Sequence, residues 1–133
     1  MTKAFIRFAR GLLRMPLYVH VWLILLSGVN VAGAILWPGA QEGLVTLAVF
    51  TLNILLMGTI TSRAGFSRLL GLGHFLWIPL AAYLVVRLQV LPAGSYAYWI
   101  RILLIMNGIS LIIDATDVVR WSLGDRREIV EDL

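Results

Sequence analysis

The chain has 133 residues, of which 60% are hydrophobic, whereas soluble domains usually contain about 45–50%. Its 11 basic and 7 acidic residues leave uncharged runs at 15–41, 43–62 and 69–86, and a fourth run, 88–113, is broken only by Arg101. This composition excludes a soluble globular fold. The absence of cysteine also excludes disulfide scaffolds and thiolate metal sites.

Each uncharged run is long enough to cross a membrane, because a spanning helix needs about 20 mostly apolar residues. We expect four such helices, at about 15–37, 43–62, 69–91 and 98–118. An interfacial segment, 1–14, would precede them and a cytoplasmic tail, 119–133, would follow. The expected fold is therefore all-α: a single integral membrane domain, 1–133, built as an up-down four-helix bundle.

The first fourteen residues have a pattern of their own. Lys3, Arg7, Arg10 and Arg14 recur at spacings of four, three and four, with mostly apolar residues between them. This pattern predicts a basic amphipathic helix at the membrane surface, with its four basic side chains facing phospholipid headgroups.

Basic residues are distributed unequally between the two ends of the predicted helices. Nine lie on the side of the chain termini: Lys3, Arg7, Arg10, Arg14, Arg63, Arg68, Arg120, Arg126 and Arg127. Only Arg87 and Arg101 lie on the other. The positive-inside rule then places both termini in the cytoplasm. Since topology accounts for the net charge of +4, we expect the phospholipid bilayer, other membrane subunits or a second copy of the chain as partners, and no nucleic acid.

The sequence also contains a weak internal repeat. A shift of 54 residues superposes five pairs of uncommon residues: Gly11 and Gly65, Arg14 and Arg68, His20 and His74, Pro38 and Pro92, Asn53 and Asn107. This register suggests two pseudo-symmetric helical hairpins related by an axis along the membrane normal.

Proline within the third predicted helix indicates a local distortion. Pro79 has no N–H, so the carbonyl of Phe75 would lack its usual donor. We therefore expect a kink about one turn after His74.

Polar residues in the predicted helices gather at one depth. His20, His74 and Asp114 each lie six residues from an interfacial arginine, which corresponds to about 9 Å along a helix. Asn107, Asp114 and Asp117 share one face of the fourth helix, and the spacing of the second helix turns Asn53 inward. The candidate ligand or ion site consists of His20, His74, Asp114, Asp117, Asn53 and Asn107.

Three interpretations of this polar level stay open. The side chains could hydrogen-bond to one another as packing elements, or form a proton or metal-ion pathway. They could also hold a b-type haem between His20 and His74, with Gly71 and Gly73 leaving room for the ring. No nucleophile motif or phosphate loop is present. We expect a non-enzymatic accessory or interaction subunit, or a small ion- or proton-linked transport unit; the alternative is a haem-binding redox protein.

Two segments support a resemblance to known proteins. They are Gly65-Phe-Ser-Arg-Leu-Leu-Gly-Leu-Gly-His74 with Trp77-Ile-Pro79, and Asp114-x-x-Asp117-Val-Val-Arg120. The chain resembles small four-span inner-membrane proteins of Gram-negative bacteria. That resemblance implies a bacterial inner-membrane setting and no particular activity.

Overall fold

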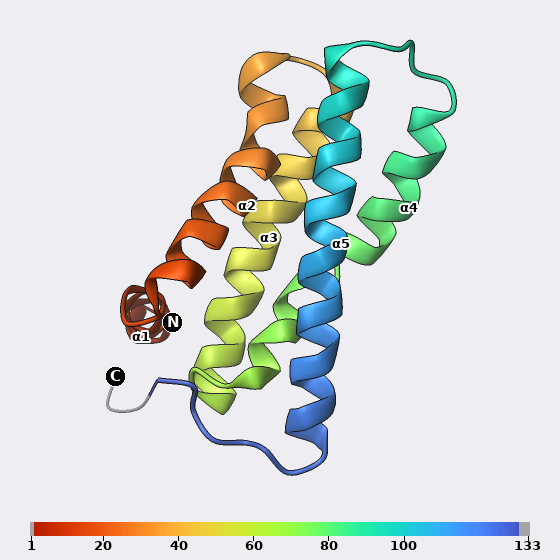
Figure 1. Cartoon of the computed structure of the whole chain (residues 1–133). Helices are drawn as coiled ribbons and strands as arrows, with labels where there is room; N and C mark the ends of the chain where they lie inside the picture. Colours follow the sequence, from red (N-terminus) through yellow and green to blue (C-terminus); the bar gives the residue numbers. More distant parts are fainter. Residues whose placement is uncertain (1, 131–133) are drawn as a thin grey trace.

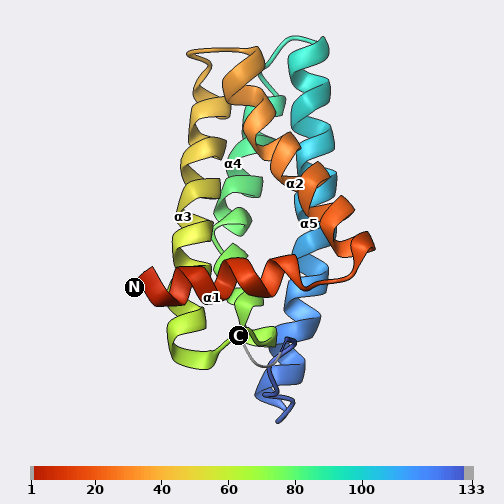
Figure 2. The ribbon, with the colours of Figure 1, turned by 90° about the vertical axis from the view of Figure 1, so that its left-hand side faces the viewer.

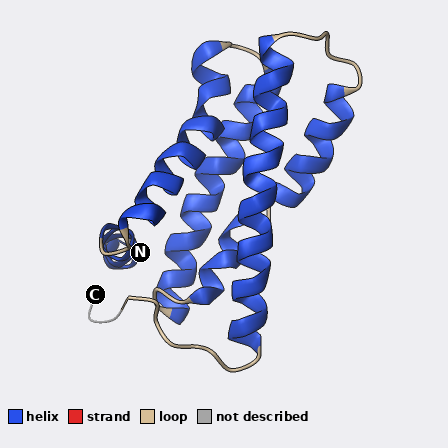
Figure 3. Cartoon of the chain, viewed as in Figure 1, coloured by secondary structure: helices blue, strands red, loops and turns tan. Residues whose placement is uncertain are grey.

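A computed structural model describes residues 2–130 (Figure 1). Its elements are α1 (Thr2–Leu13), α2 (Leu17–Leu36), α3 (Gln41–Ala64), the 3₁₀ helix η1 (Arg68–His74), α4 (Trp77–Leu88) and α5 (Ser95–Ser122). Within residues 2–130 all regular secondary structure is helical, apart from one isolated bridge between Ser67 and Glu128 (Figure 3). The all-α prediction is confirmed.

Four segments are long and apolar enough to cross a membrane: Leu17–Leu36, Gln41–Ala64, Arg68–Leu88 and Ser95–Ser122. They correspond to the four predicted helices, with ends that differ by a few residues. The largest difference is at α5, which begins three residues before and ends four residues after the predicted range 98–118.

Helix α1 runs across the long helices (Figure 2), and Val130 packs against the same small cluster as Phe8 of α1. Pro16 separates it from α2, because proline has no N–H to continue a helix but is well tolerated where one begins. Ala4, Phe8 and Gly11 form the buried face of α1. Phe8 packs on Phe66, with ring centroids 6.0 Å apart, so α1 is docked onto the body of the protein.

The third predicted helix is broken rather than kinked. The 3₁₀ helix η1 ends at His74, and α4 begins at Trp77, so Pro79 occupies the first turn of α4. In a first turn the N–H groups have no intrahelical partner, so the missing N–H of Pro79 leaves no gap. The carbonyl of Phe75, expected to lack a donor, accepts the N–H of Ile78 at 3.1 Å.

The main core lies at the end of the molecule opposite α1. Its buried members come from α2, α4 and α5: Leu26, Trp77, Leu80, Leu84, Trp99, Ile100 and Leu103. A smaller cluster of Phe8, Phe66 and Leu70 lies beneath α1. Helix α2 packs along α3, while α5 packs on η1 and α4. Toward its first residues α2 leans away from α5 (Figure 1), which separates the two helices near α1.

Candidate functional site

A groove of about 490 Å³ lies where α2 and α5 diverge, bordered by α1 at its end. One wall is apolar and comes from α1, the following turn and α2: Phe8, Leu12, Met15, Tyr18, Val19, Trp22, Leu23 and Leu26. The facing wall carries the polar residues Ser67, Arg68, His74, Ser110, Asp114 and Asp117, with Met57, Phe66, Leu70, Gly71, Ile113 and Ile129 between them. We call this feature the side groove. Its volume lies within the usual range of ligand sites, about 300–1,000 Å³.

His74 and Asp114 form the central polar contact of the side groove. His74 Nδ1 lies 2.8 Å from Asp114 Oδ2, and the two side chains are 13% and 16% exposed. The His74 ring also stacks on Trp77, with centroids 4.3 Å apart and planes 8° from parallel. The carboxylate and the indole thus fix the orientation of the imidazole, and the structure brings these two predicted site residues together.

Glycine in η1 allows this contact. A Cβ on Gly71 would lie 2.7 Å from the carbonyl oxygen of Asp114, and one on Gly73 would overlap Met57 Cγ. The backbone of η1 therefore approaches both α5 and α3 more closely than a side chain would allow. This approach brings His74 within reach of Asp114.

Asp117 belongs to a second polar contact in the same wall. Arg68 Nη1 donates to Asp117 Oδ1 at 2.6 Å, and Arg68 Nε donates to Asp125 Oδ2 at 3.1 Å. The side groove itself thus contains one arginine, two aspartates and one histidine. Its polar wall carries a net charge of −1 when His74 is neutral.

Asn107 lies just beyond the groove, one turn of α5 from Ser110. It exchanges two hydrogen bonds with Asn30, at 2.8 and 3.2 Å, and both side chains are buried. Asn30 is likewise one turn of α2 beyond Leu26. The paired amides therefore close the inner end of the groove.

Asn53 of α3 is buried as predicted, but it does not line the groove. Its hydrogen-bond partners belong to the third span. With its amide in the orientation that satisfies both neighbours, Asn53 donates to the Gly73 carbonyl at 2.9 Å and accepts from Trp77 Nε1 at 3.1 Å. These bonds hold α3 against the junction between η1 and α4. Asn53 thus supports the position of His74 indirectly.

The structure does not bring His20 to the His74–Asp114 contact. His20 Nε2 lies 2.6 Å from the carbonyl oxygen of Leu12, in the last turn of α1. His20 and His74, which the 54-residue register pairs, therefore have different partners. The bond to Leu12 instead fixes the angle between α1 and α2.

The haem interpretation assumed free space beside two glycines of η1, and the structure fills that space. The space beside Gly71 and Gly73, expected to admit a haem, is filled by the Asp114 backbone and Met57. Within residues 2–130 no three His, Cys, Asp or Glu side chains are grouped so that they could hold a metal ion.

The four basic residues of the first segment lie on α1 or at its end. Lys3, Arg10 and Arg14 are exposed. Arg7 instead donates to Glu128 Oε1 at 2.9 Å. Phe8 and Leu12 of the same helix line the side groove.

Sequence reasoning missed a buried carboxylate at the opposite end of the molecule. Glu42, in the first turn of α3, is 4% exposed. It accepts hydrogen bonds from Arg87 Nε and from the Tyr96 hydroxyl, both at 2.7 Å. The predicted second helix began at residue 43, which put Glu42 in a loop. The sequence signal for it was a carboxylate next to a predicted helix start, on the same side of the predicted bundle as Arg87.

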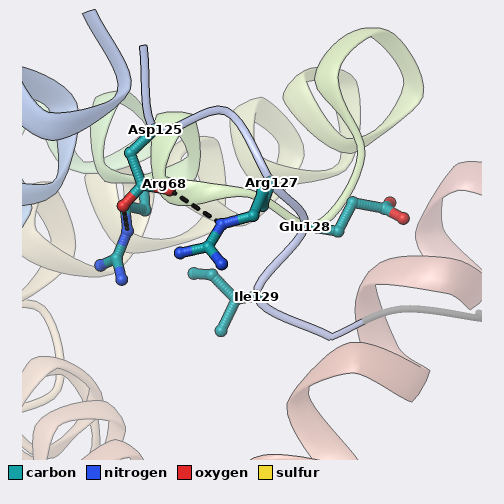
Figure 4. A pocket seen from close by; sticks show the side chains of 5 residues that line it. All are labelled: Arg68, Asp125, Arg127, Glu128 and Ile129. Carbon is teal, nitrogen blue, oxygen red and sulfur yellow. Dashed lines mark hydrogen bonds and ion pairs between the residues drawn. The ribbon is translucent and has the colours of Figure 1, made fainter. Parts of the chain in front are cut away.

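A second, smaller pocket of about 260 Å³ lies among Arg68, Asp125, Arg127, Glu128 and Ile129 (Figure 4). Asp125 accepts from Arg68 and Arg127 in this view, and also from Arg120 at 2.9 Å. Desolvation acts to raise the pKa of Asp125, but the Arg127 hydrogen bond and the nearby arginine charges lower it below its ordinary value. Asp125 is therefore an ionised anchor for the C-terminal segment.

Comparisons with known proteins add no relative: no family model, no curated protein and no solved structure matches this chain.

Proposed function

We propose that the chain is a non-enzymatic, multi-pass protein of a bacterial inner membrane that binds a ligand at a polar site in the cytoplasmic half of a four-helix bundle. The observation that carries the proposal is the His74–Asp114 contact on the wall of the side groove. Ionisable residues within membrane helices are costly, so they usually serve a function.

Charge supports the orientation. The end that carries α1 also carries nine of the 11 lysines and arginines. The other end carries two basic residues, Arg87 and Arg101. The charge of Arg87 is paired with that of Glu42. By the positive-inside rule the α1 end, and with it the mouth of the groove, faces the cytoplasm.

The closed inner end supports binding rather than conduction. Asn30 and Asn107 bridge α2 and α5 at the inner end of the side groove. Beyond them Ile100 and Leu103 are fully buried in the main core. A continuous path for ions would have to cross this packed region, so we favour an accessory or ligand-binding unit over a transport unit.

Cysteine labelling tests the membrane arrangement, because the chain has no cysteine of its own. Single cysteines at Gln41 and Ala93 should react with a membrane-impermeant maleimide added to the periplasmic side of spheroplasts. Cysteines at Thr2 and Ser122 should react only after the membrane is opened. All four positions are exposed. An odd number of crossings, or termini on opposite sides, would contradict the proposal.

Nitrogen NMR of the histidine rings tests the site. The chain has two histidines, so His20→Gln assigns both signals. In detergent micelles, Asp114→Asn should change the ring signals of His74, because His74 loses its carboxylate partner. The His20 signals should stay the same. Unchanged His74 signals would refute the polar site while leaving the membrane topology intact.

A further inference from the structure

The side groove has the two-sided character of a site for an amphipathic molecule. Its apolar wall follows α2 from Tyr18 to Leu26, a length of about 12 Å at the rise of an α-helix. The polar wall faces it from η1 and α5. In the proposed membrane arrangement the opening between α2 and α5 faces the acyl chains of the cytoplasmic leaflet.

One polar group on this wall has no partner. Ser67 is fully buried, and its hydroxyl has no hydrogen-bond partner within residues 2–130. A buried hydroxyl without a partner loses about 1–3 kcal/mol relative to a bonded one. Because Ser67 lines the groove, a polar group of a ligand could satisfy it.

The charges of the groove favour a cationic group in the ligand. Asp114 and Asp117 outnumber Arg68, and Arg68 already donates to two carboxylates. An anionic headgroup would meet this surplus of carboxylate, whereas a primary ammonium group could donate to it. Helix α1, whose Phe8 and Leu12 line the groove, carries the exposed basic side chains of Lys3 and Arg10. A phosphate next to the ammonium group would therefore meet positive charge.

We propose that the side groove binds one membrane phospholipid with a primary ammonium headgroup, such as phosphatidylethanolamine. Its ammonium group lies toward Asp114 and Asp117, and one acyl chain lies along Tyr18, Trp22 and Leu26. This inference rests on the proposed function and names the ligand class for the same site.

Native mass spectrometry can test the proposal on the full chain. The protein is released from detergent micelles that contain equal amounts of phosphatidylethanolamine, phosphatidylcholine and phosphatidylglycerol. We expect one retained phosphatidylethanolamine per chain. Retention of phosphatidylglycerol or phosphatidylcholine in preference, or of no lipid, would overturn the inference.

Matched substitutions locate the lipid. Val19 lines the groove, whereas Val21 on the same helix is 50% exposed and does not. Val19→Trp should reduce lipid retention about tenfold, and Val21→Trp should leave it unchanged. If Val19→Trp does not fold, Leu23→Trp and Leu25→Trp form a second pair. Leu23 lines the groove and Leu25 does not, so only Leu23→Trp should reduce lipid retention. Equal retention in the members of a folded pair would place the lipid elsewhere and overturn the inference.

Two further variants test the polar wall. Asp114→Asn should reduce the preference for phosphatidylethanolamine about tenfold, the size expected from losing one charge-assisted hydrogen bond. Ser67→Ala should weaken retention without lowering the unfolding temperature of the lipid-free protein, because no protein hydrogen bond is lost. An unchanged headgroup preference in Asp114→Asn would overturn the assignment of the ammonium group.

The two proposals can fail separately. If the cysteine labels and the His74 signals behave as expected but the natural chain retains no phosphatidylethanolamine, only the lipid inference is wrong. If the topology fails, the groove no longer faces a lipid leaflet and both proposals fall.

Discussion

His20 and His74 have different contacts, and for His20 the reason is a helix break between it and the arginine that precedes it. His20 was counted six residues from Arg14, but α1 ends at Leu13 and α2 begins at Leu17, so the count crosses a break at Pro16. For Asp114 and Arg120 the same count stays within α5. A fixed rise per residue holds only inside one helix. The rise-per-residue argument therefore applies to Asp114 and not to His20.

The buried amide pair is open to a direct test at the level of single residues. Asn30→Leu should lower the free energy of unfolding by about 1–3 kcal/mol, because it leaves the buried Asn107 without its partner. Replacing both asparagines by leucine should recover part of that loss, since no polar group is then left unpaired. Denaturant unfolding in micelles measures both effects. A single variant as stable as the natural chain would show that the pair contributes nothing.

At the scale of elements, hydrophobicity and charge predicted the four long apolar segments because a long uncharged run is a strong signal. The boundary between α1 and α2 was close to the predicted residue 15. The form of the third span was not predicted. Gly71 and Gly73 of the 3₁₀ segment lie against Asp114 of α5 and Met57 of α3. These contacts join residues that are distant in sequence, so no local sequence pattern reveals them.

Glycine in η1 provides the prediction at this scale. Gly71→Ala should destabilise the protein by about 1–3 kcal/mol, because the added Cβ would lie 2.7 Å from the Asp114 carbonyl oxygen and must push the two segments apart. It should also change the ring signals of His74.

Gly108→Ala in α5 is the matched control. Nothing lies within 4 Å of a Cβ at Gly108, so alanine there should stabilise α5 by about 1 kcal/mol through its higher helix propensity. Thermal unfolding of both variants in the same detergent makes the comparison. Equal effects of the two substitutions would mean that η1 is not held close to α5.

At the scale of the whole molecule, the C-terminal segment joins parts that are distant in sequence. Glu128 accepts from Arg7 of α1 and from the Phe66 N–H at 3.1 Å, and the Ile129 N–H donates to the Phe66 carbonyl at 2.7 Å. These contacts hold α1 and the tail against the same turn. The sequence predicted a cytoplasmic tail, 119–133, and its charged run Asp125-Arg-Arg-Glu128 gave no signal of these contacts.

Hydrogen exchange tests this connection. Glu128→Ala should increase the exchange of backbone amides in α1, because α1 loses its ion pair and the turn at Phe66 loses an acceptor. Amides of α4 and α5 in the main core should exchange as before. Arg127→Ala is the control, since Arg127 is 82% exposed and its hydrogen bond to Asp125 is long, at 3.4 Å. Unchanged exchange in α1 would show that Glu128 does not hold the helix.

The buried Glu42 places a constraint on how such a chain is assembled. Its two partners, Arg87 and Tyr96, belong to the other half of the sequence. During synthesis, Glu42 leaves the ribosome before either partner does. Until its partners arrive, Glu42 has to stay hydrated at the membrane surface. The hairpin of α2 and α3 therefore cannot insert completely into the membrane. The last two spans are thus expected to complete the insertion of the first two, and truncated chains that end before residue 87 should be degraded rapidly.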